Sequence, residues 1–437
     1  MPRVLIISPH FPPVNAPDMQ RVRMSLPQFV AAGWEMVVLT VDDPTTMAPL
    51  EPALLQTVPP EVRVVRAGVL SRRWTRWIGL NNLGLRALPY LYLAGRKLLR
   101  RERFDLVYFS TTQFIVLPCG RLWRWETGVP YVIDLQDPWL NDYYEQPGAP
   151  QPPGGWKYRI AHSLARLLEG WSLRRCTHVI SVSGDYLVRL ARRYPWWTPD
   201  RGSVLTFGAS EVDLQIARRQ LAEGAHLLPD TPALKIVYTG RLGPDMQPAL
   251  EILFAGLAAQ QSATSRVIEL HLFGTSYAST GRGIVTTTDL ARHHGVSHLV
   301  HEKPNRIGYL EALRLMLEGD CVLLLGSEDK AYSPSKIYPA LLTGRPVLAV
   351  APAGSVLEQK IAELGGVALV TFHGGSANDK PAITSLCEWL ARLASGSTVP
   401  LGSPLRDDLL RDKYSAPAIA AAQLRVFAAV LQLRQSA

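Results

Sequence analysis

Short apolar runs alternate with longer amphipathic segments along almost the whole chain. In the first half, runs such as RVLIIS, EMVVLT and FDLVYFST have the length of strands, and the segments between them have helical spacing. Apolar strands that alternate with helices are typical of a parallel sheet covered by helices on both faces. The pattern therefore predicts an α/β protein built on doubly wound, Rossmann-like sheets.

The alternation falters once, across residues 206–233, and restarts with LKIVYTG. Because 437 residues exceed one ordinary core, we expect two tandem domains. The predicted parts are an N-terminal domain (1–207), a connection (208–233), a second domain (234–412) and a closing helix (413–437) that crosses back to the first domain. Such sheets bind ligands beyond the carboxyl ends of their strands, so we expect a central cleft between the domains.

Composition agrees with a folded, intracellular protein. Hydrophobic residues make up 47% and charged residues 19%, which is typical of globular domains. The opening MPRVLIIS is too short for a signal peptide or membrane span, and four scattered cysteines suggest small core residues in a reducing cytosol. We therefore expect a cytoplasmic location without a transmembrane helix.

The net charge of +9 falls largely in two stretches, 71–105 and 157–176, where arginines are interleaved with Trp, Leu and Tyr. This composition suits either solvated surface helices or peripheral contact with an anionic membrane surface, and both interpretations stay open. Zinc-finger and RNP signatures are absent from the sequence, so we expect no nucleic-acid partner.

Two cations follow strands of the second domain. Arg241, in YTGRLG, lies between Gly240 and Gly243, which let the backbone approach a ligand closely. In YSPSKIYPALLTG, Ser333 predicts a helix N-cap and places Lys336 in the first turn, where free N–H groups already attract anions. Both cations together would suit a diphosphate without a metal ion. Alternatively, Arg241 pairs with a surface carboxylate and Lys336 extends into solvent.

The first domain offers a different set of candidates. Asp134 and Asp137 in VIDLQDPW are expected just beyond a strand, where a carboxylate could orient or deprotonate a hydroxyl, and Trp139 could stack on a sugar ring. A structural Asp before Pro138 is the alternative. The loop 8–21 contributes further acceptor-side candidates, although a lone histidine in a Pro-rich loop is more often structural. These candidates are His10, Asn15 and Arg21.

Other catalytic templates do not match the sequence. It has no G-x-G-x-x-G after the first strand, no Walker A motif, no G-x-S-x-G and no H-E-x-x-H. Dehydrogenase, P-loop NTPase, serine hydrolase and zincin interpretations are therefore disfavoured.

The order of several motifs resembles the GT-B fold retaining glycosyltransferases of the family 4 (group 1) type. The motifs are FPP, DLQDPW, ISVS, YTGRLG, HLFG and SPSKIYPALLTGRPVLAV. The resemblance implies transfer of a sugar from a nucleotide diphosphate sugar, without a metal ion or other cofactor and with retained configuration. It also implies donor binding by the second domain and acceptor binding by the first.

By this resemblance, Asp137, Arg241 and Lys336 carry the chemistry. Asp137 would approach the transferred sugar or the acceptor hydroxyl. The predicted donor site comprises Gly240, Arg241, Gly274, Arg306, Ile307, Ser333, Ser335, Lys336, Tyr338 and Glu358.

Several positions depart from the family pattern. The usual Gly-Gly of the first loop is replaced by Asn15-Ala16-Pro17, and Met246 and Gln247 stand where a lysine is common. Ala331 and Pro339 stand where two glutamates normally fall, so Glu358 is the candidate for ribose recognition.

The sequence thus favours a glycosyltransferase with a UDP-linked donor and a glycan or lipid-linked acceptor. A catalytically inactive GT-B partner protein is the alternative. A nucleotide-sugar epimerase on the same fold has no motif in its favour.

Overall fold

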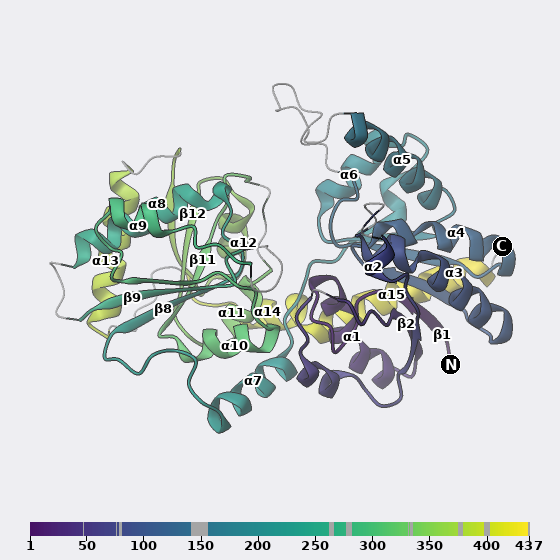
Figure 1. The fold of residues 1–437 in the computed structure, drawn as a ribbon, viewed down its shortest axis with the longest axis horizontal. Coiled ribbons are helices and arrows are strands. Elements are labelled where there is room, and N and C mark those ends of the chain that lie inside the picture. The colour runs from purple at the N-terminus through teal and green to yellow at the C-terminus, as the bar shows by residue number, and fades with distance from the viewer. Residues whose placement is uncertain are drawn as a thin grey trace. The chain divides into compact units, whose positions relative to one another are not determined.

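The computed structural model divides the chain into two compact units. The first comprises Met1–Thr46, Leu50–Phe207 and Ala416–Ala437, and the second comprises Met47–Pro49 and Gly208–Ser415. The structure describes residues 1–46, 48–75, 77, 81–140, 156–261, 266–276, 282–330, 332, 335–374, 379–396 and 403–435. Each unit contains a parallel sheet with helices on both faces, which confirms the predicted fold class (Figure 1).

The sheet of the first unit has the order β3-β2-β1-β4-β5-β6-β7, and all neighbouring strands are parallel. Its strands are β1 (Arg3–Ile7), β2 (Glu35–Val41), β3 (Arg63–Ala67), β4 (Leu106–Ser110), β5 (Tyr131–Leu135), β6 (His178–Ser181) and β7 (Gly202–Val204). Its helices are α1 (Gln20–Ala31), α2 (Arg72–Thr75), α3 (Leu83–Arg101), α4 (Pro118–Thr127), α5 (Trp156–Leu173), α6 (Gly184–Arg193) and α15 (Ala416–Gln435). The strand order reverses between β1 and β4, and such switch points are where these sheets bind ligands.

The sheet of the second unit has the order β10-β9-β8-β11-β12-β13 and is also entirely parallel. Its strands are β8 (Leu234–Thr239), β9 (Ile268–Phe273), β10 (Val300–Lys303), β11 (Cys321–Leu325), β12 (Val347–Pro352) and β13 (Ala368–Phe372). Its helices are α7 (Glu211–Glu223), α8 (Gln247–Gln260), α9 (Thr288–His293), α10 (Tyr309–Glu318), α11 (Ile337–Leu342), α12 (Val356–Leu364), α13 (Lys380–Ala394) and α14 (Asp407–Tyr414). The switch point here lies between β8 and β11.

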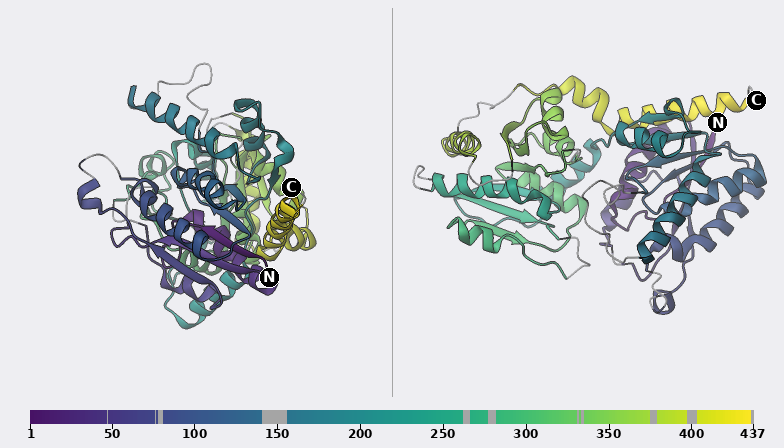
Figure 2. Two further views of the ribbon diagram at one scale, coloured as in Figure 1. Left: turned by 90° about the vertical axis from the view of Figure 1, so that its right-hand side faces the viewer. Right: turned by 90° about the horizontal axis from the view of Figure 1, so that it is seen from above.

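The closing helix α15 belongs to the first unit and packs against α1. Figures 1 and 2 show it in yellow beside the purple start of the chain. The Phe427 ring contacts Phe29 and Tyr108, while Gln423 is buried and donates to the Tyr108 hydroxyl at 2.8 Å. Over Ala416–Arg434 this helix is also long and apolar enough to cross a membrane, by length and composition alone.

Two elements differ from the sequence-based expectation. The stretch predicted as a plain connection contains α7, which packs on α10 in the second unit. Helix α11 begins at Ile337, so Lys336 is its N-cap residue and does not lie in the first turn. The reason is Pro339, whose missing N–H costs no helical hydrogen bond only near a helix start. The predicted cap Ser333 lies outside the described residues.

Candidate functional site

Two glycines and Ile307 meet beyond the carboxyl ends of β8 and β9. Gly240 follows β8 with φ of 129°, and Gly274 follows β9 with φ of 69°, so both adopt backbone conformations that favour glycine. A Cβ on Gly274 would lie 3.6 Å from Ile307 Cγ1 and 3.9 Å from the Gly240 nitrogen. The structure therefore brings these three predicted donor residues together.

Lys336 reaches from the start of α11 to the same place. Its Nζ donates to the Tyr238 hydroxyl at 3.4 Å and lies 4.5 Å from the centre of the Tyr238 ring. A Cβ on Gly240 would overlap this Nζ, so the glycine leaves the space that the lysine occupies. Burial, and secondly the positive charge of Arg241, lower the pKa of Lys336 to about 7. An anion at this point would favour the charged form again.

Arg241 forms a two-pronged ion pair with Asp245. Its Nη1 and Nη2 donate to the two carboxylate oxygens at 2.6 and 2.7 Å, and Ser327 Oγ donates to Asp245 Oδ2 at 2.7 Å. Burial by itself would raise the pKa of Asp245, but the hydrogen bonds from Arg241 and Ser327 and the Arg241 charge lower it overall. The alternative of a carboxylate partner for Arg241 is therefore observed. Arg241 also lies close enough to Lys336 for its charge to affect the pKa of the lysine.

At the switch point of the first unit, His10 is hydrogen-bonded to a buried aspartate. His10 Nδ1 lies 2.9 Å from Asp18 Oδ1, and the other Asp18 oxygen accepts from Thr111 Oγ1 at 3.0 Å and Thr112 N at 3.2 Å. Burial alone would raise the pKa of Asp18, yet the charge and hydrogen bond of His10, together with the hydrogen bonds from Thr111 and Thr112, lower it. Asp18 thus fixes the ring of His10, and sequence reasoning missed it.

Asp137 follows β5 and reaches the surface of the first unit. The surrounding protein partly shields its carboxyl group and raises its pKa, and the nearby Asp18 carboxylate adds to this effect. A carboxyl group with a raised pKa accepts a proton more readily than an ordinary aspartate does. Asp137 is thus an exposed aspartate with a raised pKa just beyond the end of β5.

Asp134 and Arg21 are not at the surface. Asp134 lies within β5 and not beyond it, and its Oδ2 is 3.1 Å from Arg21 Nε, with both side chains almost fully buried. Tyr108 and Ser110 also donate to Asp134, at 3.0 and 2.7 Å. Arg21 Nη2 donates to the Leu205 carbonyl at 2.8 Å. Arg21 was predicted on the acceptor side, but the structure places it in the core. Its charge can be buried there because Asp134 neutralises it.

Comparisons with known proteins bear on this geometry. Residues 20–208 match the family "Glycosyl transferase 4-like domain". Residues 20–208 therefore form a glycosyl transferase 4-like domain. Among curated proteins, none matches the sequence. The match agrees with the predicted resemblance to family 4 and with the prediction of a transferase enzyme.

Solved structures share the fold over nearly the whole chain. HepE of Anabaena, in complex with UDP and glucose, has 16% identity and a TM-score of 0.57, covering 98% of this chain and 100% of that chain. A TarM variant of S. aureus, in complex with fondaparinux, α-GlcNAc-glycerol and UDP, has 11% identity and a TM-score of 0.53, covering 98% and 100%. The UDP-GlcNAc 2-epimerase of Methanocaldococcus jannaschii has 10% identity and a TM-score of 0.55, covering 98% and 99%. At these identities the likeness shows the GT-B fold.

The remaining predicted donor residues lie in varied surroundings. Ser335 and Arg306 are exposed, in the turn before α11 and the loop after β10. Tyr338 is buried, and its ring stacks on Tyr414 with centroids 4.6 Å apart. The Glu358 carboxylate accepts from Gly354 N at 2.5 Å, and the Glu358 N–H donates to Ser355 Oγ, the N-cap of α12. Tyr338 and Glu358 thus have structural partners that the sequence did not indicate.

The two other acceptor-side candidates also have structural partners. Asn15 is buried and donates to Glu51 Oε2 at 3.0 Å. The Trp139 ring is half-buried and stacks on Phe114, with centroids 5.7 Å apart. Trp139 therefore keeps part of its surface for contact, whereas Asn15 does not.

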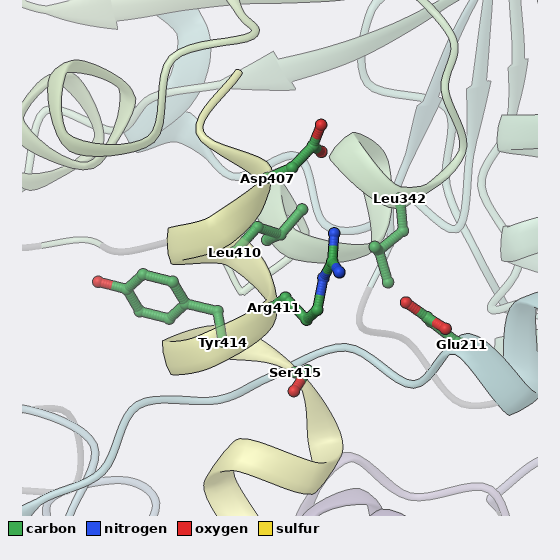
Figure 3. Close-up of a pocket in the computed structure, with 7 residues that line it drawn as sticks. All are labelled: Glu211, Leu342, Asp407, Leu410, Arg411, Tyr414 and Ser415. Carbon is green, nitrogen blue, oxygen red and sulfur yellow. The ribbon is translucent and has the colours of Figure 1, made fainter.

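One pocket in the second unit is lined by none of the predicted site residues (Figure 3). It lies at the start of α7, the end of α11 and along α14. Its lining residues are Glu211, Leu342, Asp407, Leu410, Arg411, Tyr414 and Ser415. It is thus separate from the cations and glycines beyond β8.

The basic stretches combine buried and exposed apolar residues. Helix α3 turns Ala87, Leu91 and Leu98 into the core, as a surface helix does. Along α5, three apolar residues spaced about one or two turns apart are exposed: Ile160, Leu164 and Leu167. In the first basic stretch, Trp74 and Trp77 are both more than three-quarters exposed, at 80% and 78%.

Proposed function

We propose that the chain is a retaining glycosyltransferase that moves a sugar from a UDP-linked donor to a glycan or lipid-linked acceptor, without a metal ion in the transfer step. The observation that carries the proposal is the convergence of Lys336 and Arg241 over the glycine backbone beyond β8. Phosphate oxygens suit such a place, because it combines cationic donors with close access to the backbone. The complexes of HepE and TarM with UDP support the choice of nucleotide.

In this proposal, the two cations stabilise the charge that develops on the departing nucleoside diphosphate. Asp245 accepts from two of the five N–H donors of Arg241 and so holds the guanidinium in a fixed orientation. Lys336 lies on the face of the Tyr238 ring with its pKa lowered to about 7, so the arriving diphosphate restores its full charge. A preorganised positive site of this kind performs the task that a divalent cation performs in metal-dependent enzymes.

The first unit supplies the acceptor side. Asp137 positions the acceptor hydroxyl and receives its proton, and its raised pKa suits that task. The imidazole of His10, which is held by Asp18, provides a second polar group at the same switch point. The partly exposed Trp139 ring offers an apolar face to a sugar.

A lipid-linked acceptor would bring the enzyme to the inner face of a membrane. The exposed Trp74 and Trp77 and the apolar residues of α5 support peripheral contact with an anionic surface, since arginines lie beside them in the sequence. We place the enzyme in the cytoplasm on this basis, and we expect no nucleic-acid partner.

A second candidate function is nucleotide or glycan binding without transfer. Pro339 stands in α11 where a ribose-binding glutamate is usual by the sequence resemblance, and the Glu358 carboxylate accepts from the backbone of its own loop. Transfer or donor hydrolysis over a panel of nucleotide sugars would exclude this candidate. An epimerase would instead change the sugar and release free nucleotide without any acceptor.

The proposal is tested by measuring UDP affinity of the purified chain by calorimetry. Lys336→Ala and Arg241→Ala should each weaken binding by about ten- to a hundredfold, because each removes charged hydrogen bonds worth about 1.5–3 kcal/mol. Arg292→Ala is the matched control, since Arg292 pairs with Asp289 on the exposed surface of the same unit. Unchanged UDP affinity in both site variants would reject the assignment.

A further inference from the structure

Two strands at one edge of the second sheet bring together two histidines and a glutamate. Glu269 and His271 lie two residues apart on β9, so their side chains share one face of the sheet. His301, on the edge strand β10, pairs with His271 in the register of the two parallel strands. Their imidazole rings stack with centroids 4.8 Å apart and planes inclined by 26°. The proposed transfer uses none of these three side chains.

The possible ligand atoms of this trio lie at distances that suit one metal ion. His271 Nε2 is 3.0 Å and His301 Nε2 is 3.9 Å from Glu269 Oε2, and all three ligand atoms lie within 4.8 Å of one another. Ligands about 2.1 Å from a tetrahedral zinc ion lie about 3.4 Å from each other. The two separations to Glu269 fall on either side of that value, so small side-chain rotations would complete the geometry.

The burial of the trio is graded from one side to the other. The His271 side chain is 4% exposed, Glu269 17% and His301 46%. An ion can therefore enter beside His301, while the two β9 residues are held by the strand ladder. Lys235 is the cation of the neighbouring strand whose charge acts on His271, but its ammonium donates to the carbonyl groups of Thr231 and Ala233.

We infer that Glu269, His271 and His301 form a binding site for a divalent transition-metal ion. Two imidazoles and one carboxylate are a ligand set that favours zinc, with water in the fourth position. The ion would join the edge strand β10 to β9. Because β10 leads into the loop that carries Arg306 and Ile307, the ion would stabilise the segment that contacts Gly274, without a part in the transfer step.

The test is a zinc titration of the full-length chain after treatment with a chelator. Wild-type protein should bind a single zinc ion, and His301→Ala and Glu269→Gln should each weaken binding by about tenfold or more, because each removes one of three protein ligands. His298→Ala, an exposed histidine close by in the chain, is the matched control and should bind as wild type does. Cobalt provides a second readout, since its visible absorption should appear only in the wild type and the control.

His301→Ala is the decisive variant, because His301 is the most exposed of the three and its loss should leave the fold intact, as circular dichroism will show. Zinc should raise the melting temperature of the wild type and of His298→Ala, but not that of His301→Ala. Equal zinc affinity in His301→Ala and wild type would overturn the inference. So would the absence of saturable binding, which would leave His271 and Glu269 as a hydrogen-bonded pair only.

Discussion

The two units have the same kind of sheet, but the polar residues at their switch points differ in charge and burial. Beyond β1 and β4 in the first unit, Asp18 is buried and bonded to His10, and Asp137 lies close enough for their charges to interact. Beyond β8 and β11 in the second unit, Lys336 and Arg241 converge, with Asp245 paired to Arg241. The same position in the fold thus holds two carboxyl groups in the first unit and two cationic side chains in the second.

This contrast indicates that strand ends alone do not identify functional residues. In the first unit, Asp134 and Arg21 also come from segments near the strand ends, yet their charges neutralise each other inside the core. In the second unit, Lys336 has a tyrosine ring and a like-charged neighbour beside it. A largely buried cation such as Lys336, for which the described residues provide no carboxylate partner, is therefore the better indicator of an anionic ligand.

The largest expected effect is on catalysis by the first unit. Asp137→Asn should lower the rate of UDP release from a UDP-sugar that the wild type turns over by about a hundred- to ten-thousandfold, since it removes the proton acceptor. Its UDP affinity should stay at the wild-type value, because the predicted diphosphate ligands belong to the other unit. A variant with an unchanged rate would contradict the role of Asp137.

The next prediction tests whether the buried ion pair of Arg21 and Asp134 stabilises the fold. Arg21→Met should lower the free energy of unfolding in urea by about 3–5 kcal/mol, because it leaves the Asp134 carboxylate buried and unpaired. The double variant Arg21→Met/Asp134→Leu should recover much of this loss. If the single variant lost less than about 1 kcal/mol, the pair would not be the buried structural element described above.

The smallest effect tests the space beside Lys336. Gly240→Ala should lower the free energy of unfolding by about 1–3 kcal/mol, since φ is 129°, and should also weaken UDP binding, because the new Cβ displaces the Lys336 ammonium. Gly295→Ala is the matched control, with φ of 69° and open space around the position. It should lose stability but keep its UDP affinity. Equal UDP binding by both variants would contradict the contact.

Much of the fold could be predicted because its strands are buried on both faces. Runs such as CVLLL in β11 are apolar throughout, and each is separated from the next by a helical segment. The predicted start of α11 was wrong. The prediction relied on the local start signals of Ser333 and Pro334, whereas Pro339, which lacks an N–H, must lie near the start of the helix. The sequence alone does not show which of several local helix-start signals determines the first residue of the helix.

The candidate site was predictable where residues follow adjacent strands. Arg241 and Lys336 converge because β8 and β11 are neighbours, which a doubly wound sheet implies. The partners of Arg21 and Tyr338 come from segments distant in sequence, so their burial could not be inferred. Asp245 could have been found, since it lies four residues after Arg241, but that spacing is common on surfaces.

The central claim is that Lys336 binds the donor diphosphate, and the pH dependence of UDP affinity tests it most directly. The pKa of Lys336 is lowered to about 7 without ligand, and a diphosphate nearby would raise it, so binding should be strongest where the lysine is already charged. Between about pH 7 and pH 9, where the phosphates of UDP are already ionised, wild-type affinity should fall by up to about tenfold per pH unit. Lys336→Met should bind more weakly and without this slope. A wild-type affinity that stays constant over this range, or the same slope in both proteins, would contradict the account.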